Sequence, residues 1–130
     1  QALLIRMRRA YKQELRCPEI LLYENELISD VTQAMDAMHD NIERPGQNDD
    51  VLLEVMRIDL MRTQYMVKSY LRQRLWKLQK YPLYYLKYHL DRLSPLERKF
   101  TEGVTKMTEE HMNESFLHTM PAGPGFEPFT

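Results

Sequence analysis

Long apolar runs, paired cysteines and glycine-rich loops are all scarce in this sequence. No run approaches the roughly 18 consecutive apolar residues that a membrane span needs, and residues 2–5 are too few for the core of a signal peptide. Cys17 is the single cysteine, which excludes an internal disulfide framework and fits a reducing compartment. The four glycines form no phosphate-binding loop. We therefore expect an intracellular protein with no membrane segment and no bound nucleotide.

The side chains that an enzyme needs do not come together either. The four histidines show no HExxH spacing, and no cysteine pair is present for zinc. Cys17 lies beside Pro18 with no histidine nearby in sequence, which disfavours a nucleophile. Glu109, Glu110 and His111 are adjacent, but consecutive residues of a helix point in different directions. We expect a non-enzymatic protein with no catalytic residue, metal site, cofactor or small-molecule substrate.

Helical periodicity, by contrast, runs through almost the whole chain. Apolar residues make up 43% and charged residues 28%, an ordinary composition for one globular domain. Apolar residues recur at spacings of three and four, which predicts an all-α bundle of four to five helices around one long central helix. The expected helices span residues 2–15, 24–44, 50–81 and 95–118, with a short helix or irregular aromatic connector at 83–90. Residues 1–120 are predicted to form a helical interaction domain, and 121–130 a tail or linker rich in proline and glycine.

Prolines and capping residues predict where the helices end. Pro18 closes the first helix, and Pro82 disfavours helical dihedral angles at Tyr81, so the long helix should break there. Ser94 and Glu97 flank Pro95 in the pattern of a capping box, in which each side chain accepts a hydrogen bond from the other residue's amide. A last helix therefore begins just after Ser94.

The long helix has more apolar residues than one buried stripe requires. Its predicted core-facing residues are Leu53, Met56, Leu60, Val67, Leu71, Leu75 and Leu78. Other apolar side chains occupy different angles around the helix: Val55, Ile58, Met61, Tyr65, Met66, Tyr70 and Trp76. A monomer cannot cover all of these faces, so we expect a second protein to do so and the isolated chain to be marginally stable.

Basic residues are concentrated in segment 62–92, although the whole chain has a net charge of −1. Eight of them stand there against one acid, Asp91: Arg62, Lys68, Arg72, Arg74, Lys77, Lys80, Lys87 and Arg92. Two readings remain open. The segment can make a helical DNA-binding module, in which cations meet phosphates and aromatic rings stack on bases. Alternatively, its cations pair with acids of a neighbouring subunit or are solvated.

Within this segment the sequence resembles the GINS replication family, specifically its subunits of the Sld-five type. The resemblance lies in Arg62-Thr-Gln-Tyr65 and in Ser69-Tyr-Leu-Arg-Gln-Arg-Leu-Trp-Lys-Leu-Gln-Lys-Tyr-Pro82, which match a family signature of basic residues, tyrosines and a terminal Lys-x-Pro. Further matches are Leu93-Ser94-Pro95-x-Glu97, Met120-Pro121, and Glu14 four residues before Pro18.

The resemblance implies a nuclear scaffold protein. In the family, the helical domain packs against sister subunits of a heterotetramer, and a small β-rich domain follows it through a linker. The heterotetramer joins the Mcm ring and a loading factor to form the replicative helicase, which needs it in initiation and elongation; contact with DNA would be weak or indirect. The expected partner-interface residues are Arg62, Tyr65, Met66, Tyr70, Arg72, Arg74, Trp76, Lys77 and Lys80.

Overall fold

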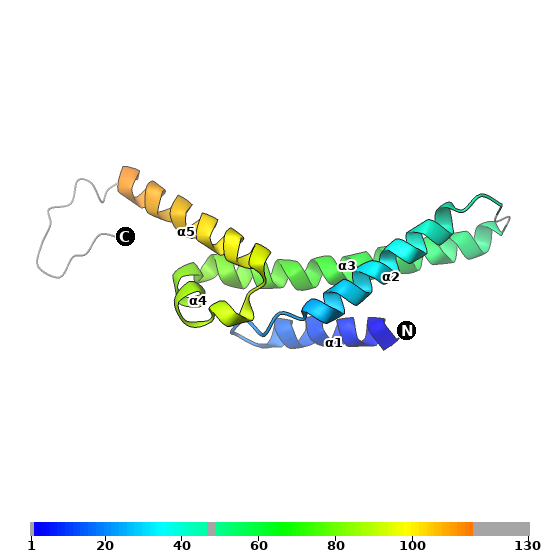
Figure 1. Cartoon of the computed structure of the whole chain (residues 1–130), viewed down its shortest axis with the longest axis horizontal. Coiled ribbons are helices and arrows are strands. Elements are labelled where there is room, and N and C mark those ends of the chain that lie inside the picture. Colours follow the sequence, from blue (N-terminus) through cyan, green and yellow to red (C-terminus); the bar gives the residue numbers. More distant parts are fainter. Residues whose placement is uncertain (1, 47–48, 116–130) are drawn as a thin grey trace, which may run out of the picture. The chain divides into compact units, whose positions relative to one another are not determined.

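The protein is mainly helical in the part of the chain that the structure describes. This computed structural model describes residues 2–46 and 49–115, which contain five α-helices, one 3-10 turn and no strand (Figure 1). The elements are α1 (Ala2–Arg16), α2 (Asn25–Glu43), α3 (Asp50–Lys80), α4 (Pro82–Tyr88), η1 (Leu90–Arg92) and α5 (Pro95–Ser115). The chain divides into two compact units, Gln1–Lys77 and Leu78–Thr130.

The first connection of the first unit begins where a proline stops α1. The amide of Cys17 still donates a helical hydrogen bond to the carbonyl of Gln13 at 3.0 Å, but Pro18 has no amide hydrogen to continue the series. Residues 17–24 then run in a non-helical conformation to α2. Side chains of α3 hold the backbone of this 17–24 connection by hydrogen bonds.

Local interactions also determine the backbone conformation where α2 ends and where α3 begins. Arg44, which precedes Pro45, has left the helical region with φ −60° and ψ 127°. Gly46 has φ 103°, a left-handed conformation that glycine adopts without a steric cost. The carboxylate of Asp49 then accepts a hydrogen bond from the amide of Leu52 at 3.2 Å and caps α3. From this cap α3 continues for 31 residues, or about 46 Å at 1.5 Å per residue.

Three helices form the main apolar cluster of the first unit. Each supplies two buried residues three or four positions apart: Met7 and Ala10 from α1, Leu27 and Val31 from α2, and Val67 and Tyr70 from α3. That spacing places each pair on one helix face. The core therefore lies where α1, α2 and the middle of α3 meet.

The second unit begins with the last three residues of α3 and turns at a proline. Tyr81 has φ −135° and ψ 63°, which ends α3, and Pro82 occupies the first turn of α4. In the capping box before α5, the Ser94 amide donates to Glu97 Oε1 at 3.1 Å, and the Glu97 amide donates to Ser94 Oγ at 3.2 Å. Glu97 is itself buried, which strengthens its local hydrogen bonds.

The helix limits agree closely with those predicted from the sequence. The all-α class is confirmed, and the segment left open at 83–90 is helical from Pro82 to Tyr88. The predicted end of the last helix at His118 and the tail 121–130 lie outside the described residues. Among the described helices, none combines the length and the apolar character needed to cross a membrane.

Replacement of the capping serine should loosen the start of α5. We expect Ser94→Ala to destabilise that helix end by about 1 kcal/mol, because the Glu97 amide loses its acceptor. Hydrogen exchange at the amides of the first turn of α5 measures the effect. Ser29→Ala, on the exposed side of α2, is the matched control and should leave exchange in α2 unchanged or slower. Equal exchange rates in Ser94→Ala and the parent chain would contradict the capping role.

Candidate partner-binding surface of the long helix

One carboxylate and two cations are buried together between α1 and α3. The Lys77 Nζ atom lies 2.7 Å from Glu14 Oε1, and the Arg74 Nη1 atom lies 3.2 Å from Glu14 Oε2. The exposed fractions are 1% for Glu14, 0% for Arg74 and 3% for Lys77. We call these three residues the ionic cluster.

Backbone carbonyl groups complete the hydrogen bonds of both cations. Lys77 Nζ donates to the carbonyl oxygens of Glu14 at 2.6 Å and Glu19 at 3.0 Å. Arg74 Nη1 donates to the carbonyl oxygen of Leu21 at 2.6 Å. The Leu21 amide in turn donates to Glu14 Oε1 at 3.4 Å. The cluster therefore ties the 17–24 connection to α3.

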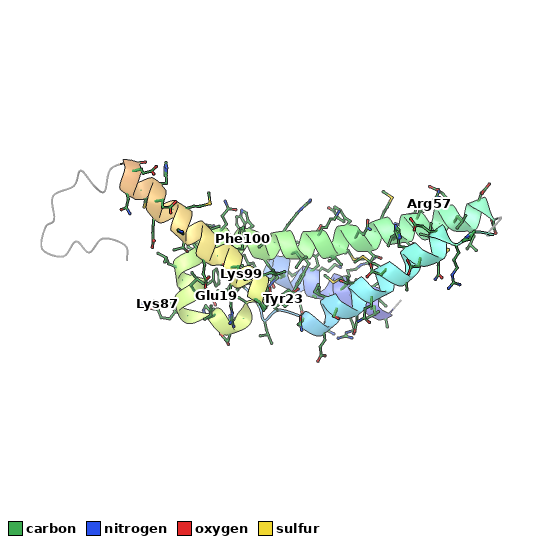
Figure 2. All side chains as sticks on the ribbon, turned by 45° about the horizontal axis from the view of Figure 1, so that its top comes forward. Glu19, Tyr23, Arg57, Lys87, Lys99 and Phe100 are labelled. Carbon is green, nitrogen blue, oxygen red and sulfur yellow. The ribbon has the colours of Figure 1, made fainter. Side chains whose placement is uncertain are left out.

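Aromatic rings from two elements lie against the Arg74 guanidinium. Its central carbon is 5.2 Å from the centre of the Tyr23 ring and 5.7 Å from that of the Tyr70 ring, within the range of cation–π attraction. The Tyr70 hydroxyl also accepts a hydrogen bond from the Glu24 amide at 3.4 Å. Figure 2 labels Glu19 and Tyr23 among the side chains drawn on the ribbon. The 17–24 connection is thus held at both of its ends.

The buried stripe of α3 follows an alternation of three and four residues. It consists of Leu60, Thr63, Val67, Tyr70, Arg74 and Lys77, all less than a tenth exposed. This is the spacing of a heptad seam, but half of its members are polar or charged. Thr63 satisfies its hydroxyl within the helix, by donating to the Asp59 carbonyl at 2.9 Å. Hydrophobicity alone therefore could not reveal the complete stripe.

This stripe corrects part of the interface expected from the sequence. Tyr70, Arg74 and Lys77 were expected to face a partner, but the structure buries all three inside the chain, where Glu14 and backbone carbonyls satisfy the two cations. The same burial removes Arg74 and Lys77 from the basic surface that a DNA-binding module would use. Sequence reasoning also missed Glu14 as their ionic partner. The sequence did carry a signal for the burial of Glu14, because Glu14 lies four residues after Ala10 and seven after Met7, on the buried face of α1.

The other predicted residues of α3 divide between surface and interior. Among the expected interface residues, Met66 is half-buried and the rest are exposed: Arg62, Tyr65, Arg72, Trp76 and Lys80. Among the expected core residues, Leu60, Val67 and Leu78 are buried, whereas Leu53, Met56, Leu71 and Leu75 are half-buried. The predicted Ser94–Glu97 cap is formed as described above.

The outer sides of α3 present large apolar side chains to solvent. Val51 is 75% exposed, Met61 66%, Tyr65 67% and Trp76 56%. Leu52, Val55 and Ile58 are exposed as well. These residues extend over most of the helix, so the described part of the chain leaves much of its apolar surface uncovered. Such a surface is typical of a protein–protein interaction site.

Within residues 2–46 and 49–115, no group of three or more His, Cys, Asp and Glu side chains is placed to hold a metal ion. The described residues therefore form a helical core held by buried charges, with an apolar helix surface outside it.

Comparison with known proteins identifies the family. The model of the Sld5 GINS complex protein helical bundle domain matches residues 25–116. The chain belongs to the Sld5 family of GINS proteins. DNA replication complex GINS protein SLD5 of Arabidopsis thaliana is 30% identical over 119 residues, which cover 88% of this chain and 54% of that protein. The human protein of the same name is 28% identical over 126 residues, which cover 92% of this chain and 56% of that protein. This chain thus spans about half the length of the curated relatives it matches.

Membership of the Sld5 family agrees with the resemblance seen in the sequence. The family model covers α2 to α5, including the whole of α3. In this chain the segment that carries the Sld5 resemblance, 69–82, contains Arg74 and Lys77 of the ionic cluster. Part of the motif therefore has a structural role inside the chain.

Removal of the cluster's single negative charge should destabilise the fold strongly. We expect Glu14→Gln to lower the free energy of unfolding by about 3–5 kcal/mol, because two cations would remain buried without a counter-ion. Urea unfolding followed by circular dichroism measures the loss. Glu54→Gln is the matched control: it removes an exposed carboxylate 3.6 Å from Arg57, and should cost less than about 1 kcal/mol. Similar losses in the two variants would show that the buried pairs contribute no more than a surface pair.

Proposed function

We propose that this chain is a non-catalytic scaffold subunit of a GINS heterotetramer that acts in nuclear DNA replication. Its partners are the sister GINS subunits, and through the assembled complex the Mcm ring and its loading factor in initiation and elongation. Family membership supports the assignment, since the relatives are named as DNA replication complex GINS proteins. The observation that carries the scaffold role is the uncovered apolar surface of α3.

The energy available from that surface is large compared with the stability of a small domain. Covering a few hundred Å² of apolar surface is worth several kcal/mol at about 25 cal/mol per Å². Domains of this size are stable by only about 5–15 kcal/mol in total. Association with sister subunits would therefore supply a sizeable share of the stability of this chain.

A DNA-binding module in segment 62–92 is the weaker alternative. Of its eight cations, Arg74 and Lys77 are buried, and Arg92 is half-buried. The exposed cations that remain are Arg62, Lys68, Arg72, Lys80 and Lys87. Apolar side chains such as Met61 and Trp76 are exposed on the same long helix. A surface of mixed cations and large apolar groups suits a protein interface better than a phosphate backbone.

Co-expression with the other three GINS subunits tests the proposal. We expect a complex whose native mass corresponds to one copy of each of the four chains, whereas the chain expressed alone is only marginally stable and aggregates as it unfolds. Native mass spectrometry and thermal unfolding measure the two outcomes. A chain that stays out of the complex, and that unfolds alone as a monomer in a sharp transition independent of concentration, would contradict the scaffold role.

Truncation of Trp76 tests the surface of α3 directly. Trp76 is 56% exposed, and aromatic residues of this kind often dominate the binding energy of an interface. We expect Trp76→Ala to weaken assembly by about 2 kcal/mol, or roughly thirtyfold, while leaving the helix content unchanged. Titration of the variant against the other three subunits gives the affinity. Gln79→Ala, three residues further along α3 and also exposed, is the control and should assemble normally.

A further inference from the structure

A groove lies between α1 and α3 on the surface of the first unit. Its volume is about 750 Å³, and all of its lining residues belong to these two helices. On α1 the lining residues are Leu4, Arg8, Tyr11 and Lys12, spaced by four, three and one. On the α3 side they fall between Ile58 and Met66, a little over two helical turns. Both walls are therefore regular helix faces, and the groove runs along them.

The α3 wall of this α1–α3 groove is rich in exposed apolar side chains. Ile58, Met61 and Tyr65 are 41%, 66% and 67% exposed, and they follow one another at spacings of three and four. Leu4 faces the same groove from α1. A helix with an apolar stripe of its own can fill such a groove with side chains at positions i, i+3 and i+4. The shape and the apolar lining thus suit a helix.

The charge of the groove indicates which kind of helix it can bind. Three lining residues are cations, Arg8, Lys12 and Arg62, and one is an acid, Asp59. The basic character continues along α1, where a second hollow of about 390 Å³ is lined by Arg8, Lys12 and also Arg9 and Arg16. A ligand lying in the groove would therefore meet positive potential along its edges.

Helix α1 has no exposed acid to offset these cations. The only acidic residue of Ala2–Arg16 is Glu14, which is 1% exposed and engaged by the ionic cluster. Five basic residues of α1 are exposed: Arg6, Arg8, Arg9, Lys12 and Arg16. Burial of Glu14 thus leaves cations as the only charged residues exposed on α1. Complementarity calls for a partner with carboxylates at its edges.

We propose that the α1–α3 groove binds an amphipathic helix of another protein chain, whose apolar stripe is bordered by acidic residues. The inference rests on the proposed scaffold function, because the partner helix belongs to a fellow subunit of the complex. The apolar stripe covers Ile58, Met61 and Tyr65, while the acidic border pairs with Arg8, Lys12 and Arg62.

Two other occupants fit the groove less well. A second copy of this chain would bring the same basic helix, so a symmetric contact through the groove would set α1 cations against α1 cations. A nucleic acid would satisfy the cations, but its phosphate backbone would leave the aliphatic side chains Leu4, Ile58 and Met61 in water. An acidic amphipathic helix satisfies both the charges and the apolar lining.

Charge reversal within the four-subunit complex tests the proposal. The groove variant carries Arg8→Glu, Lys12→Glu and Arg62→Glu. The control variant carries Arg6→Glu, Arg57→Glu and Lys68→Glu, which reverse three exposed cations of the same two helices outside the groove. Both variants change the net charge equally. We expect recovery of the complex to fall at least tenfold for the groove variant and less than twofold for the control, with unchanged circular dichroism for both.

An apolar variant and a cross-linking measurement identify the occupant. Met61→Asp should reduce recovery about as much as the charge reversals, because it places a carboxylate on the apolar lining. Carbodiimide treatment of the unmodified complex should join the Lys12 amine to a carboxylate of another subunit, which peptide mass spectrometry locates. We expect that carboxylate to lie within a helix, three or four residues from large apolar residues.

The outcomes separate this inference from the scaffold function. If the unmodified chain enters no complex, the scaffold function and the groove inference are both contradicted. If it enters the complex and the groove variant does so equally well, the groove inference alone is overturned. A Lys12 cross-link to a second copy of this chain would also overturn it. So would a groove variant that assembles normally but loses fluorescence-anisotropy binding of a DNA oligonucleotide, because the groove would then be a nucleic-acid site.

Discussion

A single buried carboxylate neutralises much of the charge that α3 carries into the interior of the first unit. Glu14 contacts both Arg74 and Lys77, and all three residues are almost fully buried. Buried charges are costly unless they are paired and hydrogen-bonded, so this arrangement is stable only when α1 and α3 hold one relative register. The ionic cluster thereby fixes the position of α3 against α1, and the carbonyl groups of the 17–24 connection complete its hydrogen bonds.

The distribution of residues on α3 reverses the usual relation between polarity and burial. Its inner stripe contains Thr63, Arg74 and Lys77, whereas Met61 and Trp76 on its outer sides are exposed. A protein that functioned alone would gain stability by the opposite distribution. The arrangement becomes understandable if the outer sides are interior surfaces of a larger assembly. The groove beside α1 fits the same explanation, because with Glu14 buried the exposed charges of α1 are all positive.

The fold was predictable from the sequence because local signals determine it. Pro18, Pro82 and the Ser94–Glu97 pair mark helix ends by steric restriction and capping, which depend on neighbouring residues alone. The site was less predictable. The buried stripe of α3 changes from apolar to charged residues at Arg74. A prediction based on hydrophobicity therefore selected Leu71 and Leu75 instead, which are only half-buried. The partner of Arg74 is 60 residues away in sequence, and only the folded chain brings the two together.

The hydrogen bonds from the cations of α3 to the 17–24 connection go to main-chain oxygens, so they depend on its path, while Tyr23 is the side chain of the connection that lies against Arg74. Glu19 and Leu21 each offer a carbonyl group that any other residue could offer equally well. Substitutions at these two positions therefore leave both carbonyl acceptors in place. An insertion or deletion in the connection is different, because it would shift the carbonyl groups out of reach of Arg74 and Lys77. The length of this connection, more than its composition, is what selection would preserve among descendants of the same ancestor.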